Sequence, residues 1–563
     1  MNKLAEQFFA TLCSDETFWK RKLQDDFNFS GAQTARTSGW KFIYQRLSKP
    51  RGGIEEEFSR EPKDGRLGLS RRPQTTLRDV PYPIQLQIPN SRIVSLVAGG
   101  MSFHALDSEG QIHVWGTLDG TSHALTSDGF SESAKSTNTP LRLQLPSRTR
   151  SISCGRIHSS TMDSTNSIWT FMNWGRPFRL STQRLSSNPD LIPIQVECGW
   201  MFSSVLTKSG DVFIWWPFSG RMETLVRDKM TSMDQEGDKQ KATNDGVIPC
   251  VCWDLALDPY LLPPIPSLPD LSTSDDAKGY KHTQIMQIAG FDNHLIALTN
   301  HGHVLMFDSL ANEGTAPQGS WQYLPNFSEA NRVRVHPTFS KGKIAAPERM
   351  KITHISAHYL KFFAYSTGSN SVVLMGDVNS TPESAPTIIP ALQNKSVISV
   401  VVGDYHYCAL TATGKLLTWG AYSRGALGLG DPADIPVGTP GGFPTEEHRQ
   451  RALDLNLGTP PEVQEPTAVR FDHHRKKPKD RFCIGAAAAG WHTGALVIDL
   501  EPNENDEDSD IEVELETSQP ALGRGSGHRL PFINHAGGFG LGRGASVFRV
   551  GYAGRAMPRG RGL

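Results

Sequence analysis

The chain has 563 residues, of which 38% are hydrophobic and 20% are charged, and its formal net charge is −1. This length exceeds that of an ordinary compact domain, unless the domain is a closed array of repeats. The near-zero net charge excludes a global electrostatic attraction to nucleic acid or to an anionic membrane. No run of about 18 apolar residues occurs, so we expect no membrane span.

The seven cysteines are spread along the chain without a CxxC pair or a zinc-ligand spacing. We therefore expect reduced, buried thiols in an intracellular protein of the cytoplasm, the nucleus or both. The N-terminus lacks the apolar core of a signal peptide, because Glu6, Asp15 and Glu16 interrupt it. Glycine (52) and proline (37) are both plentiful, which favours turns and short strands over long helices.

Residues 1–50 differ from the rest of the chain, because their apolar residues recur every four positions. This spacing predicts two amphipathic helices with a break at Ser14 and Asp15, either of which is a good N-cap. Residues 40–47 (WKFIYQRL) indicate a third short helix. These helices either pack on the rest of the fold or form a docking surface. The apolar residues concerned include Leu4, Phe8, Phe9, Leu12, Phe18, Trp19 and Leu23.

The next segment, residues 51–60 (RGGIEEEFSR), is polar and poorly suited to a strand, so either one closing strand of the fold is lost there or the fold closes loosely. Residues 64–69 (DGRLGL) carry a Gly-x-Leu-Gly pattern, which recurs at Gly425 and Gly428.

From residue 93 onward one unit recurs along the chain. An apolar run leads to a glycine, a second apolar run follows, and a third run ends in tryptophan; Gly99 to Trp115, Gly199 to Trp215 and Gly403 to Trp419 each span sixteen positions. The seven unit starts lie in residues 93–116, 150–175, 194–216, 285–308, 352–376, 403–431 and 483–498. The sixth unit is complete, whereas the seventh lacks its second half, whose ending recurs at residues 64–69.

Short β-rich runs bounded by turn residues predict antiparallel strands. A single unit cannot bury both of its faces, so neighbouring units must stack. Seven units with a split last unit predict an all-β, seven-bladed β-propeller over residues 65–500, closed by strands from both ends of the chain. The repeat residues to which we assign a structural role are Gly99, Trp115, His158, Gly199, Trp215, His294, Gly403, His406, Trp419, Gly428 and His492.

Histidine fills the same slot of four units, at His158, His294, His406 and His492. A metal or catalytic role is one interpretation. A slot that is filled once per blade favours the other, a structural histidine that hydrogen-bonds the turn. Serine or phenylalanine occupies the slot elsewhere, so no ring of ligands is complete, and we expect no metal, cofactor or catalytic site.

Long insertions interrupt the repeats at residues 221–283, 309–350 and 430–482. We expect partly disordered loops on one rim of the ring, which either bind a partner or are tolerated surface insertions. The basic run at residues 473–479 is either a nuclear signal or a solvated loop. Residues 501–563 form an acidic linker and a Gly/Arg-rich tail, which is either unstructured or binds RNA.

The repeat residues resemble the regulator of chromosome condensation repeat family, whose pattern runs Gly-x-x-His, Ala-Leu, Gly, Trp-Gly, Gly-x-Leu-Gly. The resemblance covers roughly residues 65–500 and implies a seven-bladed propeller. The stretch LCSDETFWKRKLQDDF is similar to the second half of an F-box, and residues 35–44 are similar to the linker of fungal F-box proteins of this repeat type. The first half of the F-box, with its Leu-Pro start, does not precede it.

The F-box resemblance implies docking on the Skp adaptor of a cullin-RING ubiquitin ligase, with Phe9, Leu12, Phe18, Trp19 and Leu23 at the contact. The propeller would then be the substrate receptor, and no enzyme. Two alternatives stay open. The repeat family implies a guanine-nucleotide exchange factor for a small GTPase, and a plain interaction scaffold needs no further feature. No hydrolase, zinc-protease, P-loop or dinucleotide motif is present.

Overall fold

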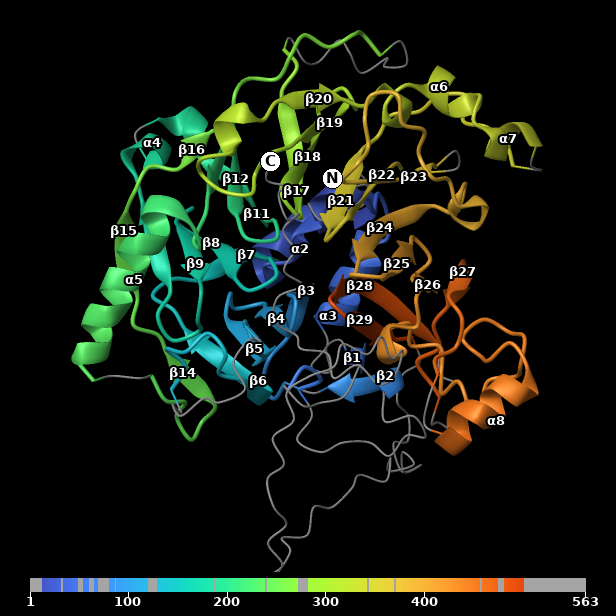
Figure 1. Ribbon diagram of the computed structural model, residues 1–563, viewed down its shortest axis with the longest axis horizontal. Coiled ribbons are helices and arrows are strands. Elements are labelled where there is room, and N and C mark those ends of the chain that lie inside the picture. The colour runs from blue at the N-terminus through green and yellow to red at the C-terminus, as the bar shows by residue number, and fades with distance from the viewer. Residues whose placement is uncertain are drawn as a thin grey trace, which may run out of the picture.

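The computed structural model describes residues 13–31, 34–48, 54–59, 65–68, 80–86, 88–119, 129–186, 188–237, 240–271, 282–341, 344–368, 371–455, 458–473 and 480–500. The strands of these residues form seven sheets. Each sheet contacts the next, and the last contacts the first, so that the sheets stand in a closed ring (Figure 1). The Gly/Arg-rich tail, the acidic linker and most of the basic run lie outside the described residues.

In six of the sheets the strands run outward from the central axis in chain order, whereas in the seventh two C-terminal strands are followed by two strands from the N-terminal part of the chain. The innermost strands are β3 (Ile93–Ala98), β7 (Thr149–Cys154), β11 (Pro193–Cys198), β17 (Ile285–Phe291), β21 (His354–His358), β24 (Val397–Val402) and β28 (Arg481–Ala489). The second strands are β4 (Ser102–Asp107), β8 (Ser159–Asp163), β12 (Ser203–Thr207), β18 (His294–Thr299), β22 (Lys361–Tyr365), β25 (His406–Thr411) and β29 (His492–Asp499).

The outer strands complete the blades. The third strands are β5 (Ile112–Gly116), β9 (Ile168–Phe171), β13 (Val212–Trp215), β19 (Val304–Phe307), β23 (Val373–Asp377), β26 (Leu416–Gly420) and β1 (Ile54–Ser59). The fourth strands are β6 (Thr137–Gln144), β10 (Phe178–Ser181), β16 (Tyr260–Leu261), β20 (Trp321–Tyr323), β27 (Val463–Ala468) and β2 (Val80–Leu86).

Six of the sheets are complete blades of four or more strands, and the sheet β21–β22–β23 has three. The propeller therefore has six complete blades, and the prediction of seven complete blades is not confirmed. The outer edge of β23 is not bare, because Met375 exchanges two backbone hydrogen bonds with Thr387 at 3.0 and 2.8 Å. The side-chain amide of Gln393 likewise pairs with the backbone of Val373 at 3.1 and 3.0 Å. A segment that is not a strand thus fills the place of a fourth strand.

Of the two alternatives left open for residues 51–60, the structure shows that the closing strand is present. Strand β1 pairs with β29 from Ile54↔Val497 to Ser59↔His492 and with β2 on its other side. As the third strand of its blade, β1 has a partner along both edges, and this pairing outweighs its poor intrinsic strand preference. One sheet therefore joins the N- and C-terminal parts of the ring, which begins at Ile54, before the predicted start at residue 65.

The insertions are also more regular than predicted. The first contains α5 (Gly220–Gln235), followed by β14 (Val247–Pro249) and β15 (Trp253–Ala256), which pair in parallel with β6 and β10 and lead into β16. One insertion thus runs along the outer edges of three successive blades. The remaining helices are α4 (Gln183–Ser186), α6 (Ala330–Arg334), α7 (Pro337–Lys341) and α8 (Glu446–Leu455), with 3-10 turns at Pro189–Leu191, Ala316–Gln318, Pro325–Phe327, Pro390–Leu392 and Ser423–Gly425.

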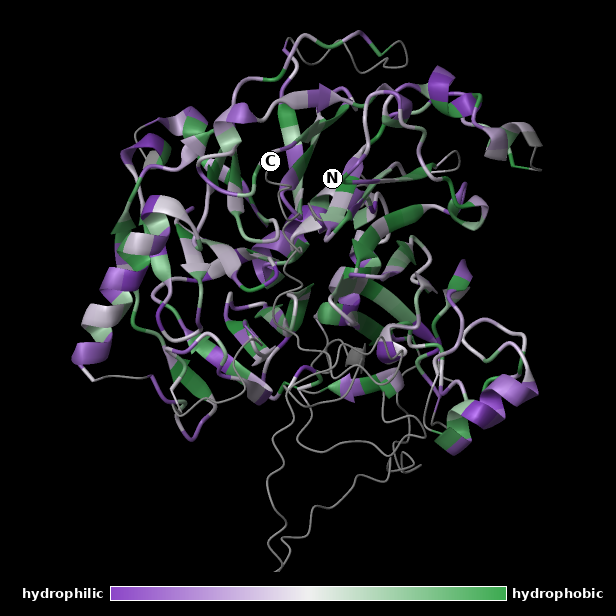
Figure 2. Ribbon diagram, in the orientation of Figure 1, coloured by the Kyte–Doolittle hydropathy of each residue, from purple (hydrophilic) through white to green (hydrophobic). Residues whose placement is uncertain are grey.

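A buried arginine fastens α5 to the ring. The side chain of Arg176 is 1% exposed and donates to Asp234 at 2.6 Å and to Gln240 at 2.9 Å. Helices α5 and α8 present mostly hydrophilic residues at the periphery, whereas the ring strands are largely hydrophobic (Figure 2). None of the helices in the described residues is long and apolar enough to cross a lipid bilayer.

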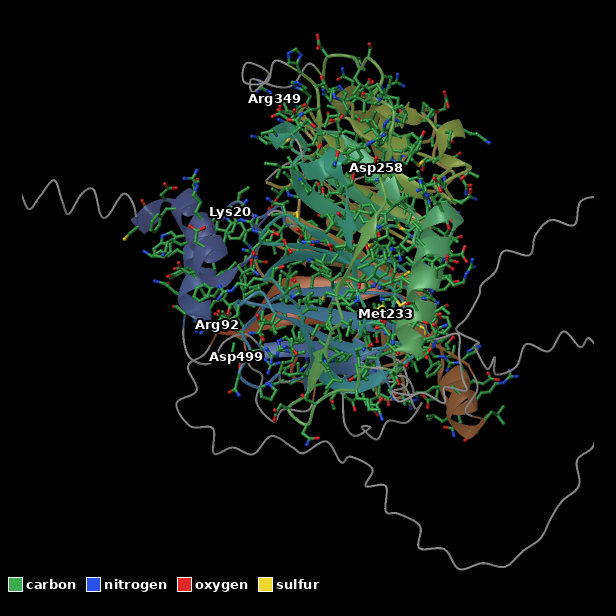
Figure 3. All side chains as sticks on the ribbon, turned by 90° about the vertical axis from the view of Figure 1, so that its left-hand side faces the viewer. Lys20, Arg92, Met233, Asp258, Arg349 and Asp499 are labelled. Atoms are coloured by element: carbon green, nitrogen blue, oxygen red, sulfur yellow. The ribbon has the colours of Figure 1, made fainter. Side chains whose placement is uncertain are left out.

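Helices α2 (Glu16–Phe27) and α3 (Trp40–Leu47) lie on one face of the ring, opposite the face that carries α5 (Figure 3). The Asp15 side chain caps α2 by accepting from the Thr17 backbone at 2.8 Å, as predicted. The predicted third helix is α3, while the helix predicted before Ser14 falls almost wholly outside the described residues. Leu23, Trp40, Ile43 and Leu47 are buried in one core cluster with residues of three blades.

Candidate functional site

The glycine of each Gly-x-x-His turn makes room for the residue three positions later. A Cβ placed on Gly155, Gly199 or Gly403 would overlap the side chain of His158, Phe202 or His406, respectively. The slot side chain therefore folds back over its own turn and points into the ring. This packing explains why a glycine precedes the slot whether a histidine or a phenylalanine fills it.

Two slot histidines connect one blade to the next. His158 Nε2 lies 2.9 Å from Ser203 Oγ and 3.2 Å from the Phe202 carbonyl, and His406 Nε2 lies 2.9 Å from Thr493 Oγ1. Burial lowers the pKa of both imidazoles to about 4, so they are uncharged near neutral pH.

The other two slot histidines differ from this pair. His492 is buried, and its ring centroid lies 4.7 Å from that of Phe103, whereas His294 is half-buried. Among the described residues, no group of three or more histidine, cysteine, aspartate or glutamate side chains is arranged to hold a metal ion.

The repeat tryptophans fill the space between blades. Trp115, Trp215 and Trp419 are each no more than 3% exposed. Trp215 Nε1 donates to Thr170 Oγ1 of the preceding blade at 3.2 Å.

The Gly-x-Leu-Gly ending forms the same turn twice. The Gly428 backbone donates to the Gly425 carbonyl, and Gly68 donates to the Gly65 carbonyl, both at 2.9 Å. Residues 65–68 thus supply the ending that the seventh unit lacks.

Residues in the turn between the first and second strands of four blades meet over the central axis. The Arg156 guanidinium lies 5.2 Å from the centroid of the Trp200 ring, which lies 5.2 Å from the Tyr359 ring. The Tyr359 ring in turn lies 5.8 Å from the Tyr405 ring. These four side chains come from four blades, and we call them, together with Asp404, the axial bridge.

Asp404 fixes this arrangement. Its carboxylate lies 3.9 Å from Arg156 and 3.3 Å from His358 Nε2. Arg156 and Asp404 belong to blades that are not neighbours, so their contact crosses the central opening. Burial opposes the ionisation of Asp404, but the hydrogen bond from His358 and the charge of Arg156 outweigh it and lower the pKa of the carboxyl.

The axial bridge has the composition of a protein-binding centre. Tryptophan, tyrosine and arginine are the residues that most often dominate binding energy at interfaces. Tyr405 is 49% exposed, whereas Trp200 and Tyr359 are half-buried, so the cluster offers aromatic surface that is already held in place. The inner strands run from the α2 side towards this bridge, because Asn28 donates to the Thr149 carbonyl at the start of β7. The bridge therefore lies on the face opposite α2 and α3.

Sequence reasoning did not find the axial bridge. Its members occupy the turn between the first and second strands of their blades, where each unit has a different residue. Aromatic residues at such positions, as in Gly199-Trp200 and Asp404-Tyr405, are the available signal. Contact between distant units does not follow from a linear repeat.

A cavity of about 1200 Å³ occupies the centre of the ring. Innermost strands of the blades line it, and Gln24, Asp25, Asn28 and Ser30 of the N-terminal segment border it on the other face. Glu197 faces this cavity and accepts from Ser153 Oγ and Gln195 Nε2, both at 3.0 Å. Burial raises the pKa of the Glu197 carboxyl to about 7, even though these two hydrogen bonds oppose the shift.

The stability of the ring should respond to the ionisation of Glu197. A pKa that is raised from 4.5 to about 7 means that the folded state holds this proton more tightly, so its stabilisation is complete below pH 4.5 and is lost as the pH rises through 7. We expect Glu197→Gln to remove this loss. Melting temperatures measured from pH 5 to pH 8 should fall more steeply for the natural chain than for the variant, and parallel curves would contradict the assignment.

The residues predicted to contact the Skp adaptor differ in how far they are buried. Leu23 is 0% exposed and packs in the core, which corrects its assignment to a partner surface. Trp19 is half-buried against Tyr44, with ring centroids 5.0 Å apart, and Phe18 is also half-buried. Phe9 and Leu12 lie outside the described residues.

Comparison with known proteins supports the assignment of the repeat. Residues 397–425 match the family described as Regulator of chromosome condensation (RCC1) repeat. "SCF-associated factor 1" of Saccharomyces cerevisiae is 36% identical over 112 residues, which are 19% of this chain and 14% of that protein. "Protein pim1" of Schizosaccharomyces pombe is 22% identical over 374 residues, which are 64% of this chain and 53% of that protein. The chain thus spans about half or less of the length of these relatives.

Among more distant matches is "E3 ubiquitin-protein ligase HERC2" of Mus musculus, 27% identical over 164 residues, covering 26% of this chain and 3% of that protein. Among solved structures, human WBSCR16 covers 80% of this chain and is itself covered in full, with a TM-score of 0.48 and 16% identity. Yeast RCC1 (Prp20) bound to Kap60 covers 83% of this chain and is covered to 94%, with a TM-score of 0.48 and 16% identity.

Proposed function

We propose that this protein is the target-recognition subunit of an SCF-type, cullin-RING ubiquitin ligase, without catalytic activity of its own, in the cytoplasm or the nucleus. The N-terminal helices would bind the Skp adaptor, and the axial bridge would bind the target protein. The relatives named SCF-associated factor and E3 ubiquitin-protein ligase support a ubiquitin-pathway role in general. The observation that carries the proposal is the division of the molecule into two opposite faces joined by a rigid core.

The helical pair is held firmly on the ring, as an adaptor-binding module needs to be. The Ala35 backbone donates to the Ile398 carbonyl at 2.7 Å, and Arg36 donates to the Ala412 carbonyl at 3.2 Å. On the other side, Arg46 donates to the Leu500 carbonyl at 2.8 Å. These bonds reach different blades, so a bound adaptor would have a fixed orientation relative to the ring and to its target.

The adaptor contact proposed here is narrower than the F-box resemblance implies. Leu23 is buried in the core and Trp19 packs on Tyr44. Phe18 is half-buried and packs edge-on against Trp19, with ring centroids 5.2 Å apart, and it is the described residue of this set that we assign to the adaptor contact. Phe9 and Leu12 complete the proposed contact. An apolar surface of this kind is typical of helical docking modules.

Co-purification with a purified Skp adaptor tests the proposal. The full chain should form a complex in size-exclusion chromatography, and a Phe9→Asp/Phe18→Asp variant should lose it. A Tyr405→Ser variant is the matched control, because it changes an exposed aromatic residue on the opposite face and should keep the adaptor. No complex with the full chain, or accelerated nucleotide release from a small GTPase, would contradict the proposal.

A further inference from the structure

A proline-rich segment follows β16 on the periphery of the ring. Residues 262–271 read LPPIPSLPDL, with leucine or isoleucine at every third position: Leu262, Ile265, Leu268 and Leu271. Four prolines stand between them. A period of three fits neither a helix nor a strand, whose periods are 3.6 and 2.

Solvent exposure follows the same period. Leu262 is buried, and Ile265 and Leu268 are half-buried against a core cluster of two neighbouring blades. The prolines, at 263, 264, 266 and 269, are all exposed. No helix, strand or turn occurs from residue 262 to residue 271. Polyproline II is the regular conformation with three residues per turn and no internal hydrogen bonds. The period of three in the exposure of this segment therefore indicates a polyproline II helix, one edge of which packs on the ring.

The ring holds the segment at both ends. The Leu262 backbone donates to the Val212 carbonyl at 2.9 Å, and Trp321 Nε1 donates to the Pro263 carbonyl at 2.9 Å. At the other end, His303 Nε2 donates to the Pro269 carbonyl at 2.8 Å. Thr299 Oγ1, 2.9 Å from His303 Nδ1, sets the tautomer that makes this donation possible. The extended shape is therefore fixed before any partner arrives.

We propose that residues 263–270 are a docking site for a partner domain that recognises polyproline II through a groove lined by aromatic residues. Such grooves read proline rings on a preformed extended helix, and the affinity benefits because little chain entropy is lost. The apolar edge of the segment packs on the ring, so the partner would bind the other two edges. One of them carries Pro263, Pro266 and Pro269, and the other carries Pro264 and Ser267.

This site is independent of the proposed ligase role. It is bounded by β16 and β20, which are outer strands at the periphery of the ring (Figure 1). A domain bound there would leave free both the axial bridge and the face of α2 and α3. It would therefore join a third component to the molecule.

Calorimetric titration of the full chain with a panel of purified SH3 and WW domains tests the inference. At least one domain should bind, and Pro263→Ala/Pro266→Ala/Pro269→Ala should weaken that binding about tenfold or more, which is ~1.4 kcal/mol. Pro461→Ala, an exposed proline in another segment, should leave it unchanged. The melting temperature of each variant shows whether the ring is intact.

A synthetic peptide of residues 261–271 supplies the second comparison. The full chain should bind the selected domain more tightly than the peptide does, since the ring fixes the extended shape. Binding of the peptide but not of the full chain would show that the ring hides the prolines, and would overturn the inference. Failure of every domain in the panel to bind the full chain, or equal binding by the triple variant, would overturn it as well.

Discussion

Replacing Trp40 by alanine should release helices α2 and α3 from the ring at a cost of about 3–5 kcal/mol, the usual cost of truncating a buried tryptophan. The Trp40 side chain is 2% exposed, and its ring lies 6.4 Å from that of Phe29 and under the Lys20 ammonium at 5.3 Å. It belongs to the core cluster that joins the helices to the ring. Hydrogen exchange should show residues 16–47 losing protection while distant blades keep theirs.

Gln45→Ala is the matched control for this experiment, because it changes an exposed residue of the same helix. If the SCF proposal holds, the Trp40 variant should still bind the adaptor, while transfer of ubiquitin to a target on the ring becomes inefficient. Unchanged protection of α2 and α3 in the Trp40 variant would mean that the hydrogen bonds of Ala35, Arg36 and Arg46 suffice to hold the helices.

The features that sequence predicts best are those repeated along the chain. The glycine, slot and tryptophan positions recur at fixed spacing, because each blade packs in the same way against its two neighbouring blades. Trp215 illustrates this, since its indole bonds to Thr170 of the preceding blade. The helices also follow from local signals, namely the four-residue spacing and the cap at Asp15.

The features that sequence misses depend on partners far away in the chain. Strand β1 is polar, and only its position between β29 and β2 makes it a strand. Strands β14 and β15 join the edges of blades formed 105 and 75 residues earlier (Val247↔Arg142 and Trp253↔Phe178), and no local pattern marks that pairing. The same limit applies to Leu23, whose apolar character is compatible with both a partner surface and a core.

The axial bridge is the clearest example of a feature that the sequence does not predict, and we expect its disruption to have a large effect on target binding. Trp200→Ala should weaken target binding by about 2 kcal/mol or more, roughly thirtyfold, because truncating a central interface tryptophan usually costs that much. The Trp200 ring contacts both Arg156 and Tyr359, so its loss also frees these two neighbours to move. Binding should be measured by interferometry against proteins that the natural chain retains.

Two further variants distinguish a direct contact between Trp200 and the target from an indirect effect through the stability of the ring. Trp253→Ala removes a half-buried tryptophan on the outer edge of the ring and should leave target affinity unchanged. Trp200→Phe keeps an aromatic face for Arg156 and should recover part of the lost affinity. If Trp200→Ala and Trp253→Ala weaken binding equally, the target is recognised through the stability of the ring rather than at its axis, and the bridge has only a structural role.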